Sequence, residues 1–268
     1  AGLSMATAAG IKLPAKTGEK IDLAENALLF YCEHTTGYSE SVREPFSQPT
    51  MEQRALKESY AWEANSRTAL IGEEAMGLLQ SMFVSEKEPS LLIFNTLNWS
   101  RSGLATVYID HQVVARGKMA GVFSQDGERM AAQPVASRSD GTYWAIWLKD
   151  IPAFGYKKFT VKALDIPIAM ADPGLPAAIE NSWYRVTADP AKGAITSWYD
   201  KELKLELVDA SSPYKMGEFI LEQLGNRSQM ESRKLDDFKR SPLDKVWFES
   251  MVKGEIWTSL KFIGESST

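Results

Sequence analysis

The sequence has little cysteine and little histidine, with one cysteine and two histidines among 268 residues. Cys32 alone cannot form an internal disulfide, and no CxxC pair is present to hold zinc or to carry redox chemistry. His34 and His111 are too few for a metal site made only of histidines. A Ser-His-Asp or Cys-His catalytic group would have to use one of them, so few enzyme classes remain.

Long hydrophobic runs and blocks of like charge are also missing. No apolar run approaches the roughly 20 residues that cross a bilayer, so we expect no membrane partner. The 30 lysines and arginines and the 35 aspartates and glutamates give a net charge of −5, and neither sign collects in one stretch. A nucleic-acid-binding protein needs a basic surface, so we expect no nucleic-acid partner. The 44% of hydrophobic residues is typical of a soluble globular protein.

The first third of the chain has helical periodicity. Residues 1–20 mix small residues with glycine and proline and lack the features of a signal peptide, so we expect a linker or a frayed segment there. The pattern predicts a short helix over 21–33, a loop over 35–49 and a long helix over 50–83, which begins with a Thr-Met-Glu-Gln capping box. The apolar stripe of the long helix exceeds what the short helix can cover, which predicts a missing helical partner or burial against the β part.

The rest of the chain has the two-residue period of β-strands. Residues 142–148 are apolar on both faces, as expected for a strand inside a sandwich. Residues 189–193 predict a hairpin turn, and the charged residues 231–240 predict a loop. The strand-forming segments are 91–95, 104–109, 142–148, 157–162, 183–188, 194–199, 216–224 and 246–263.

These patterns predict an α+β fold, in which a segment of a helical hairpin or bundle precedes a mainly antiparallel β-sandwich. Prolines after residue 165 indicate a boundary between two β regions. We therefore expect a helical segment with its linker over 1–89, a small β-sandwich domain over 90–165, and the start of a large β-sandwich domain over 166–268.

The densest group of reactive residue types is formed by Cys32, Glu33 and His34. Adjacent positions on a helix point in different directions, so Cys32 and His34 cannot act on one ligand if the helix continues through them. His34 is either a single metal ligand at a helix end, with partners from elsewhere, or a structural histidine. The residues alone leave both interpretations open.

Three other groups of residues have side chains that could carry out chemistry or bind a ligand. Glu40 and Glu44 could form the carboxylate pair of a retaining glycosidase, about 5–5.5 Å apart, but a solvated loop explains them more simply. His111 follows Asp110 at a strand end, which predicts a turn without an assigned function. The eight tryptophans suggest sugar stacking, although core packing is the simpler explanation for those in strands. The tryptophans in predicted strands include Trp144, Trp147, Trp183 and Trp198.

Several stretches resemble the α-mannosidases of glycoside hydrolase family 38. They correspond to the part of those enzymes that follows the catalytic barrel, and they keep the order of the family over residues 21–210. The stretches are LLFYCEHTTG at 28–37, the helix 53–64 ending in YAWEA, LIFNTLNW at 92–99, IPAFGY at 151–156, ENSWYRV at 180–186 and GAITSWYDK at 193–201.

The resemblance implies a zinc ion in the full-length enzyme. In this family His and Asp ligands from an N-terminal barrel hold a catalytic zinc together with one His from the middle domain, and His34 matches that last ligand. Where family members more often have a second His and an Asp, this chain has Glu33 and Thr35, a form that some bacterial relatives share. The resemblance implies no zinc bound by this chain alone and leaves the substrate contacts unknown.

The resemblance also implies that the catalytic carboxylates lie outside this chain. The barrel that carries them would precede Ala1, so no catalytic residue is expected here. The expected function is that of a fragment of an α-mannosidase that removes terminal α-linked mannose from glycans with retention of configuration, inactive by itself. Its expected partners are a mannose-containing glycan and the missing N-terminal barrel of the same parent chain.

Two alternatives remain. The first is a non-catalytic carbohydrate-binding or structural β-sandwich module, which predicts an exposed aromatic row on one sheet. The second is an epimerase or lyase with a related sandwich, which would need site histidines in the β part, where His111 alone is present. The sequence does not determine the cellular location; a soluble protein of the bacterial cytoplasm or periplasm is expected.

Overall fold

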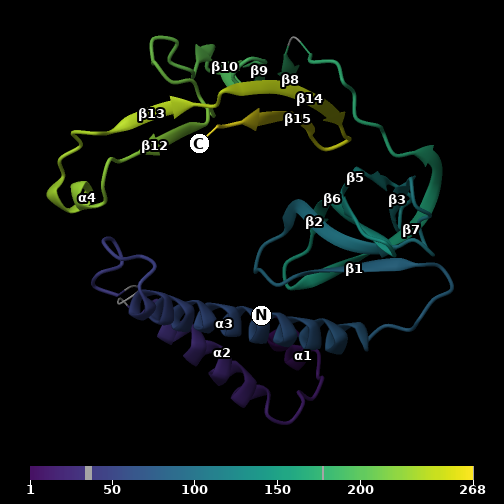
Figure 1. Cartoon of the computed structure of the whole chain (residues 1–268). Coiled ribbons are helices and arrows are strands. Elements are labelled where there is room, and N and C mark those ends of the chain that lie inside the picture. Colours follow the sequence, from purple (N-terminus) through teal and green to yellow (C-terminus); the bar gives the residue numbers. More distant parts are fainter. Residues whose placement is uncertain (34–37, 177, 268) are drawn as a thin grey trace.

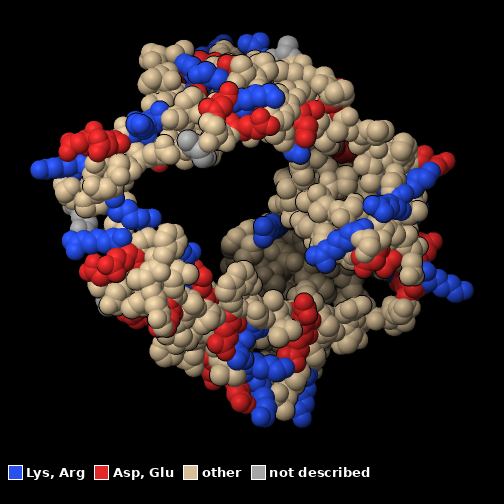
Figure 2. Space-filling model, in the orientation of Figure 1, with Lys and Arg blue, Asp and Glu red and all other residues tan. Residues whose placement is uncertain are grey.

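The computed structural model describes residues 1–33, 38–176 and 178–267. Its elements form a helical part and two β parts, arranged around a central opening (Figure 1; Figure 2). The predicted α+β arrangement, with helices before antiparallel sheets, is confirmed. Lysines and arginines are interspersed with acidic residues over the face drawn in Figure 2. None of the described helices is long and apolar enough to span a membrane.

The elements of the three parts follow one another along the chain. The helical part contains α1 (Gly2–Ala8), α2 (Thr17–Cys32) and α3 (Gln48–Gln80). The first β part contains β1 (Ser90–Asn95), β2 (Arg101–Asp110), β3 (Lys118–Ser124), β4 (Arg129–Met130), β5 (Ala132–Ser137), β6 (Gly141–Ile151) and β7 (Gly155–Pro167). The second contains β8 (Ile179–Glu180), β9 (Tyr184–Asp189), β10 (Ala194–Asp200), β11 (Leu205–Glu206), β12 (Ile220–Gln223), α4 (Ser228–Ser232), β13 (Lys239–Pro242), β14 (Lys245–Lys253) and β15 (Thr258–Glu265).

The helical part is an antiparallel pair with a short third helix against it. Lys20 near the start of α2 pairs with Glu74 near the end of α3, at 2.9 Å. Small residues let the helices approach closely, since Ala6 of α1 is fully buried and Ala75 of α3 is only 3% exposed. The interface leaves long apolar side chains on α2 and α3 exposed, as the excess apolar stripe predicts. They include Leu28, Leu29, Leu56, Trp62 and Leu70.

Two expectations about the helices were wrong. Residues 1–20 are not a linker throughout, because they contain α1 and the start of α2. The segment is not frayed at α1 either, since Ala6 is fully buried. The long helix begins at Gln48, not at Thr50, and Ser47 is its N-cap. Pro49 is accepted in the first turn, where its missing N–H costs nothing. Thr50 is therefore the third residue of α3 and does not form the predicted capping box.

The first β part is a small sandwich of two antiparallel sheets, β1-β7-β3-β4 and β2-β6-β5. Trp144 and Ile146 of β6 point into its core and meet Val122 of β3 and Phe159 of β7, all at most 1% exposed. The outer face of β6 is less covered than predicted, because Trp147 is 42% exposed. The sandwich reaches Pro167, and the proposed division of the chain into three domains stays a prediction.

The second β part consists of one four-stranded sheet and two hairpin-like ribbons. The predicted hairpin is present between β9 and β10, where Gly193 takes a positive φ of 59°. The charged stretch 231–240 is not wholly a loop, because it overlaps the end of α4 and the start of β13. Its strand residues pair with β12, and Arg240 meets Glu222 at 2.7 Å. Local charge alone did not reveal this cross-strand partner.

The three parts surround the central opening, and neighbouring parts meet through few side chains. Phe83, which follows α3, packs its ring edge-on against Tyr156 at 4.8 Å and against Phe94 at 6.1 Å between ring centres. Before the other end of α3, the Val42 carbonyl accepts a hydrogen bond from the Arg227 guanidinium beside α4, at 3.2 Å. The helical part thus contacts both β parts, one near each end of α3 (Figure 1).

The two β parts are joined by the buried side chain of Gln133. Its Oε1 accepts hydrogen bonds from the backbone N–H groups of Ile256 and Trp257, at 3.1 and 3.0 Å. The neighbouring Glu255 pairs with Arg129 at 2.6 Å. The turn between β14 and β15 is thereby fastened to the small sandwich, and a Cβ atom at Gly254 would collide with the Gln133 carboxamide.

Replacing Gly254 with alanine is expected to loosen this junction by roughly 1–3 kcal/mol, because the added methyl group displaces a buried carboxamide. Hydrogen exchange at the Ile256 and Trp257 amides should accelerate by about tenfold or more. Gly77→Ala is the matched control, since a Cβ there meets nothing within 4 Å. Unchanged exchange in the Gly254→Ala variant would contradict the role assigned to this contact.

Candidate functional site

The first candidate site is the C-terminal end of α2, which leads into His34. Helix α2 stops because Glu33 takes an extended conformation, with φ −56° and ψ 137°. The Lys57 ammonium of α3 donates to the carbonyls of Phe30 and Glu33, at 2.9 and 3.4 Å, and pairs with the Glu33 carboxylate at 2.9 Å. These bonds satisfy carbonyls that a helix end leaves without partners.

Packing holds the same helix end against α3. The rings of Phe30 and Tyr60 stack at 5.4 Å between centres, with an interplanar angle of 25°. The Lys57 side chain is only 13% exposed, so its bonds to α2 are largely shielded from water. The backbone directly before His34 is therefore fixed to the long helix by both a ring stack and a cation. Lys57 carried no signal in the sequence, because its partners lie 24 and 27 residues away.

His34 itself lies outside the described residues, as does Thr35. Cys32 is exposed as a free thiol at the last position of α2. Within the described ranges, no three His, Cys, Asp or Glu side chains come together in a group that could hold a metal ion. The described residues do not make up a zinc site by themselves, and a complete site would need ligands from elsewhere.

Glu40 and Glu44, the second candidate pair, lie in the turn region before α3. The Glu40 carboxylate lies 3.7 Å from the Arg43 guanidinium. The Glu44 backbone N–H donates to the Glu40 carbonyl at 2.7 Å, and the Ser47 hydroxyl donates to the Glu44 carbonyl at 3.0 Å. The main-chain groups of both glutamates thus build the turn, which agrees with the simpler interpretation of a solvated loop.

His111 lies in the turn after β2. Its Nδ1 is 3.3 Å from the Ser139 carbonyl and its Nε2 is 3.1 Å from the Thr142 hydroxyl. Beside it, a hydrogen bond from Tyr108 to Asp140 raises the pKa of the tyrosine to about 12 and lowers the pKa of the aspartate. Both ring nitrogens of His111 thus have oxygen partners at the start of β6 and in the turn before it, as expected for a structural histidine.

The tryptophans divide between core and surface. Trp144 is 1% exposed in the sandwich core, so the core-packing interpretation is confirmed for it. That interpretation is wrong for Trp147 and Trp183, which are 42% and 58% exposed. Trp198 is half-buried, with its ring edge-on to Tyr184 at 5.8 Å. Periodicity could not tell which face of β6 is covered, and Trp183 precedes β9 instead of belonging to it.

Sequence reasoning missed the buried Asn95 at the end of β1. Its Nδ2 lies 2.7 Å from the Trp99 carbonyl and 3.1 Å from the carbonyls of Ile151 and Pro152. Its Oδ1 accepts from the Leu97 backbone N–H at 3.0 Å. Asn95 thereby joins the loop after β1 to the turn between β6 and β7. The available signal was a single polar residue at the end of an apolar strand.

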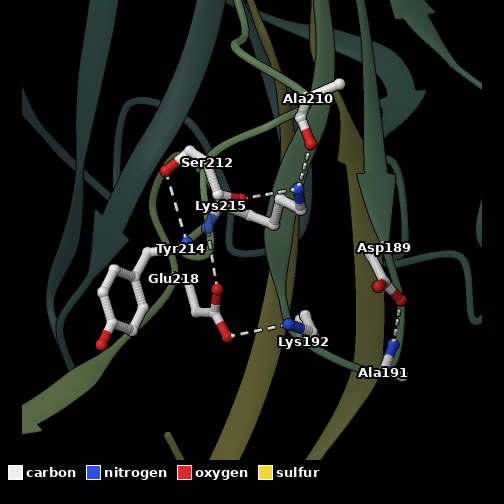
Figure 3. Close-up of polar contacts among 8 residues, drawn as sticks. All are labelled: Asp189, Ala191, Lys192, Ala210, Ser212, Tyr214, Lys215 and Glu218. Atoms are coloured by element: carbon white, nitrogen blue, oxygen red, sulfur yellow. Dashed lines mark hydrogen bonds and ion pairs between the residues drawn. The ribbon is translucent and has the colours of Figure 1, made fainter. Parts of the chain in front are cut away.

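A second missed group surrounds the nearly buried carboxylate of Glu218. The Lys215 backbone N–H donates to it at 2.8 Å and the Lys192 ammonium at 3.2 Å, and both contacts lower the pKa of Glu218 (Figure 3). The Lys215 ammonium turns to the carbonyls of Ala210 and Ser212 (Figure 3). These contacts hold the loop before β12 against the turn between β9 and β10, which indicates a structural role.

Comparison with known proteins gives partial matches among solved structures. No protein-family model matches the chain, and no curated protein matches it. It is similar to a glycosyl hydrolase family 38 protein from Enterococcus faecalis, at 14% identity and a TM-score of 0.42, over 88% of this chain and 32% of that one. It is also similar to an α-mannosidase from Enterococcus faecalis V583, at 12% identity and a TM-score of 0.42, over 81% and 33%. The chain thus matches about one third of the length of each of these proteins.

Proposed function

We propose that this chain is part of an α-mannosidase-like glycoside hydrolase, in which it forms the end of the middle helical region and the start of the β region. The order of the sequence motifs carries the proposal. Two of these motifs, at 92–99 and 151–156, are brought together by the buried Asn95, which bonds to Ile151 across 56 residues. This contact supports the proposal because it holds two of the motifs side by side.

In this proposal His34 supplies one zinc ligand, and the other ligands come from a barrel that this chain does not include. Zinc bound there would act as a Lewis acid toward sugar oxygens. The role of this chain is to hold that ligand in position, because Lys57 and the Phe30–Tyr60 stack fix the backbone that leads into His34. A ligand held on a fixed backbone keeps its geometry as the substrate enters.

The proposal is tested by comparing the full-length enzyme with the 268-residue chain. We expect the full-length enzyme to hydrolyse an aryl α-mannoside with retention of configuration, and the chain alone to show no turnover above the uncatalysed rate. Product stereochemistry can be followed by proton NMR. Zinc-dependent turnover by the chain alone would overturn the assignment of catalytic groups to a separate barrel, and absence of mannosidase activity in the full-length enzyme would overturn the function.

A non-catalytic carbohydrate-binding module is the second candidate. It is favoured by the exposure of Trp147 and Trp183, which offer apolar ring surface on the β parts. The two functions differ in one measurement, because a module would bind glycans without any hydrolysis by the full-length protein.

A further inference from the structure

A cavity of about 670 Å³ lies where the helical part meets the small sandwich (Figure 1). Its walls are α1, the end of α3, the end of β1 and the turn between β6 and β7. Cavities that bind small molecules have volumes of about 300–1,000 Å³ and often lie at junctions of this kind. Neither the sequence motifs nor the candidate sites described above give this cavity a role.

The β wall of the cavity is aromatic. Phe94 of β1 pairs in register with Tyr156 of β7, and their ring centres lie 5.7 Å apart. Their neighbours Leu91 and Ile93 pack against the sandwich core, so Phe94 and Tyr156 lie on the opposite, outer face of the sheet. The contacts of both rings with Phe83 show that this face is turned toward the end of α3.

The helical wall is kept open by short side chains. Gly2 of α1 lies against α3, because a Cβ atom there would be 3.0 Å from the Ala75 Cβ. Ser4 and Ala8 lie one turn apart on another face of α1, and both line the cavity. Helix α1 is therefore held through one face, and its short side chains on the other face leave the space unfilled.

Phe154, at the edge of the cavity, is held in a strained conformation. Its φ of 44° lies in the left-handed region, which a bulky side chain rarely adopts and glycine adopts readily. Its backbone N–H donates a hydrogen bond to the Leu97 carbonyl at 2.9 Å, which fixes the turn. The ring is nevertheless 64% exposed, so burial in the sandwich does not offset this strain. Strained residues of this kind collect at ligand-binding positions, which is a second and independent indication of a ligand.

The rings of the lining favour an aromatic ligand. Phe83, Phe94, Phe154 and Tyr156 all line the cavity, and a flat ligand can pack edge-on or offset against such rings. The thioethers of Met5 and Met82 add to this preference, because sulfur makes favourable contacts at the edges of aromatic rings.

The cavity also favours an uncharged ligand. No lining side chain carries a charge, and the polar ones, Ser4, Thr96 and Tyr156, offer only hydroxyl groups. Lys158, on the same outer face of β7 as Tyr156, is paired with Glu86. A charged group would lose its water here without gaining an opposite charge, whereas a single hydroxyl or amine could bond to the lining.

We propose that this cavity binds a neutral aromatic small molecule of two or three rings. The ligand packs between the rings of the β wall and the short side chains of α1. It contacts both the helical part and the small sandwich, so its binding stabilises the junction between them. This inference goes beyond the proposed hydrolytic function and does not depend on it.

The experiment measures binding of N-phenylnaphthylamine, a neutral aromatic compound, to the 268-residue chain by the rise of its fluorescence. We expect saturable binding of one molecule per chain. Anilinonaphthalene sulfonate carries the same rings with an added anionic group, and it should bind about tenfold or more weakly, because the sulfonate finds no charged partner in the lining.

Two variants change opposite walls of the cavity. Ala8→Phe puts a ring into the space from α1, and Phe154→Gly removes a ring while keeping the positive φ. Each should weaken binding of N-phenylnaphthylamine by about tenfold or more, through lost room or lost ring contact. If one variant does not fold, the other decides the outcome.

Two matched controls make the same substitutions elsewhere. Thr7→Phe adds a ring to α1 at an exposed residue outside the lining, and Phe46→Gly removes a ring that is 85% exposed before α3. Binding in both should stay within about twofold of the original chain.

Three results would overturn the proposal, whether or not the full-length protein hydrolyses mannosides. The first is no saturable binding, or binding that Ala8→Phe and Phe154→Gly weaken no more than the controls do. The second is equal or tighter binding of the anionic compound. The third is binding by the 268-residue chain but not by the full-length protein, which would mean that another segment of the parent chain fills the cavity.

Discussion

Replacing His34 with alanine in the full-length enzyme is expected to lower its bound zinc and its turnover of an aryl α-mannoside together. Removal of a group that only supports a metal ligand already costs 10- to 100-fold, so loss of a ligand should cost about a hundredfold or more. Zinc per folded molecule, measured by atomic emission, and the rate constant kcat give the two readouts.

The other histidine of the chain provides the control for this experiment. His111 lies in the turn after β2, and its ring nitrogens are near the Ser139 carbonyl and the Thr142 hydroxyl. His111→Ala should therefore leave zinc content and kcat unchanged, even if it lowers stability slightly. Full zinc occupancy in the His34→Ala enzyme would return His34 to a structural role, and equal losses in both variants would point to a general folding defect.

Replacing Asn95 with alanine is expected to give the largest loss of stability among the polar residues described. The variant loses the hydrogen bonds of the side chain and leaves the Ile151 and Pro152 carbonyls without this partner. The Pro152 carbonyl keeps the Gly155 N–H at 3.2 Å, and a buried group left without a hydrogen bond costs about 1–3 kcal/mol, so the sandwich should lose about 1–3 kcal/mol. The measurement is the thermal midpoint followed by tryptophan fluorescence, to which Trp144 contributes from the sandwich core.

Asn98→Ala is the matched control, because Asn98 is exposed three residues further along the same loop. It should change the free energy of unfolding of the sandwich by less than about 0.5 kcal/mol. If Asn95→Ala unfolds at the same temperature as Asn98→Ala, the two turns are held by other contacts. The support that Asn95 gives to the proposed function would then be lost as well.

Much of the fold could be predicted because periodic segments carry their own signal. The long helix and the β6 strand follow from the spacing of apolar residues, and the β9–β10 hairpin follows from its turn residues. The start of α3 could not be located, because Ser47 and Thr50 both suit an N-cap position and Pro49 suits the first turn. The exposure of Trp147 could not be predicted either, because it depends on what covers the outer face of a sheet.

The candidate site was less predictable than the fold. The residue types left His34 open between a metal ligand and a structural histidine, and only the resemblance to a family favoured the ligand, since no spacing brings other ligands to it. The side chains that organise the structure around the motifs act across long separations: Lys57 reaches back 24 and 27 residues, and Gln133 holds residues 123 and 124 positions away. Such contacts leave no local pattern, since each residue is compatible with an ordinary exposed position.

The small number of contacts between the helical part and the two β parts determines how the chain unfolds. Cooperative unfolding requires that neighbouring parts share much of their stabilising contact. The contacts between the parts include a few aromatic rings, the Gln133 carboxamide, the Arg129–Glu255 pair and the Arg227 guanidinium, which are few for parts of this size. We therefore expect each part to melt largely on its own, so that no single free energy of unfolding describes the chain. A substitution in the sandwich, such as Asn95→Ala, shifts the transition of that part and leaves the helical pair folded.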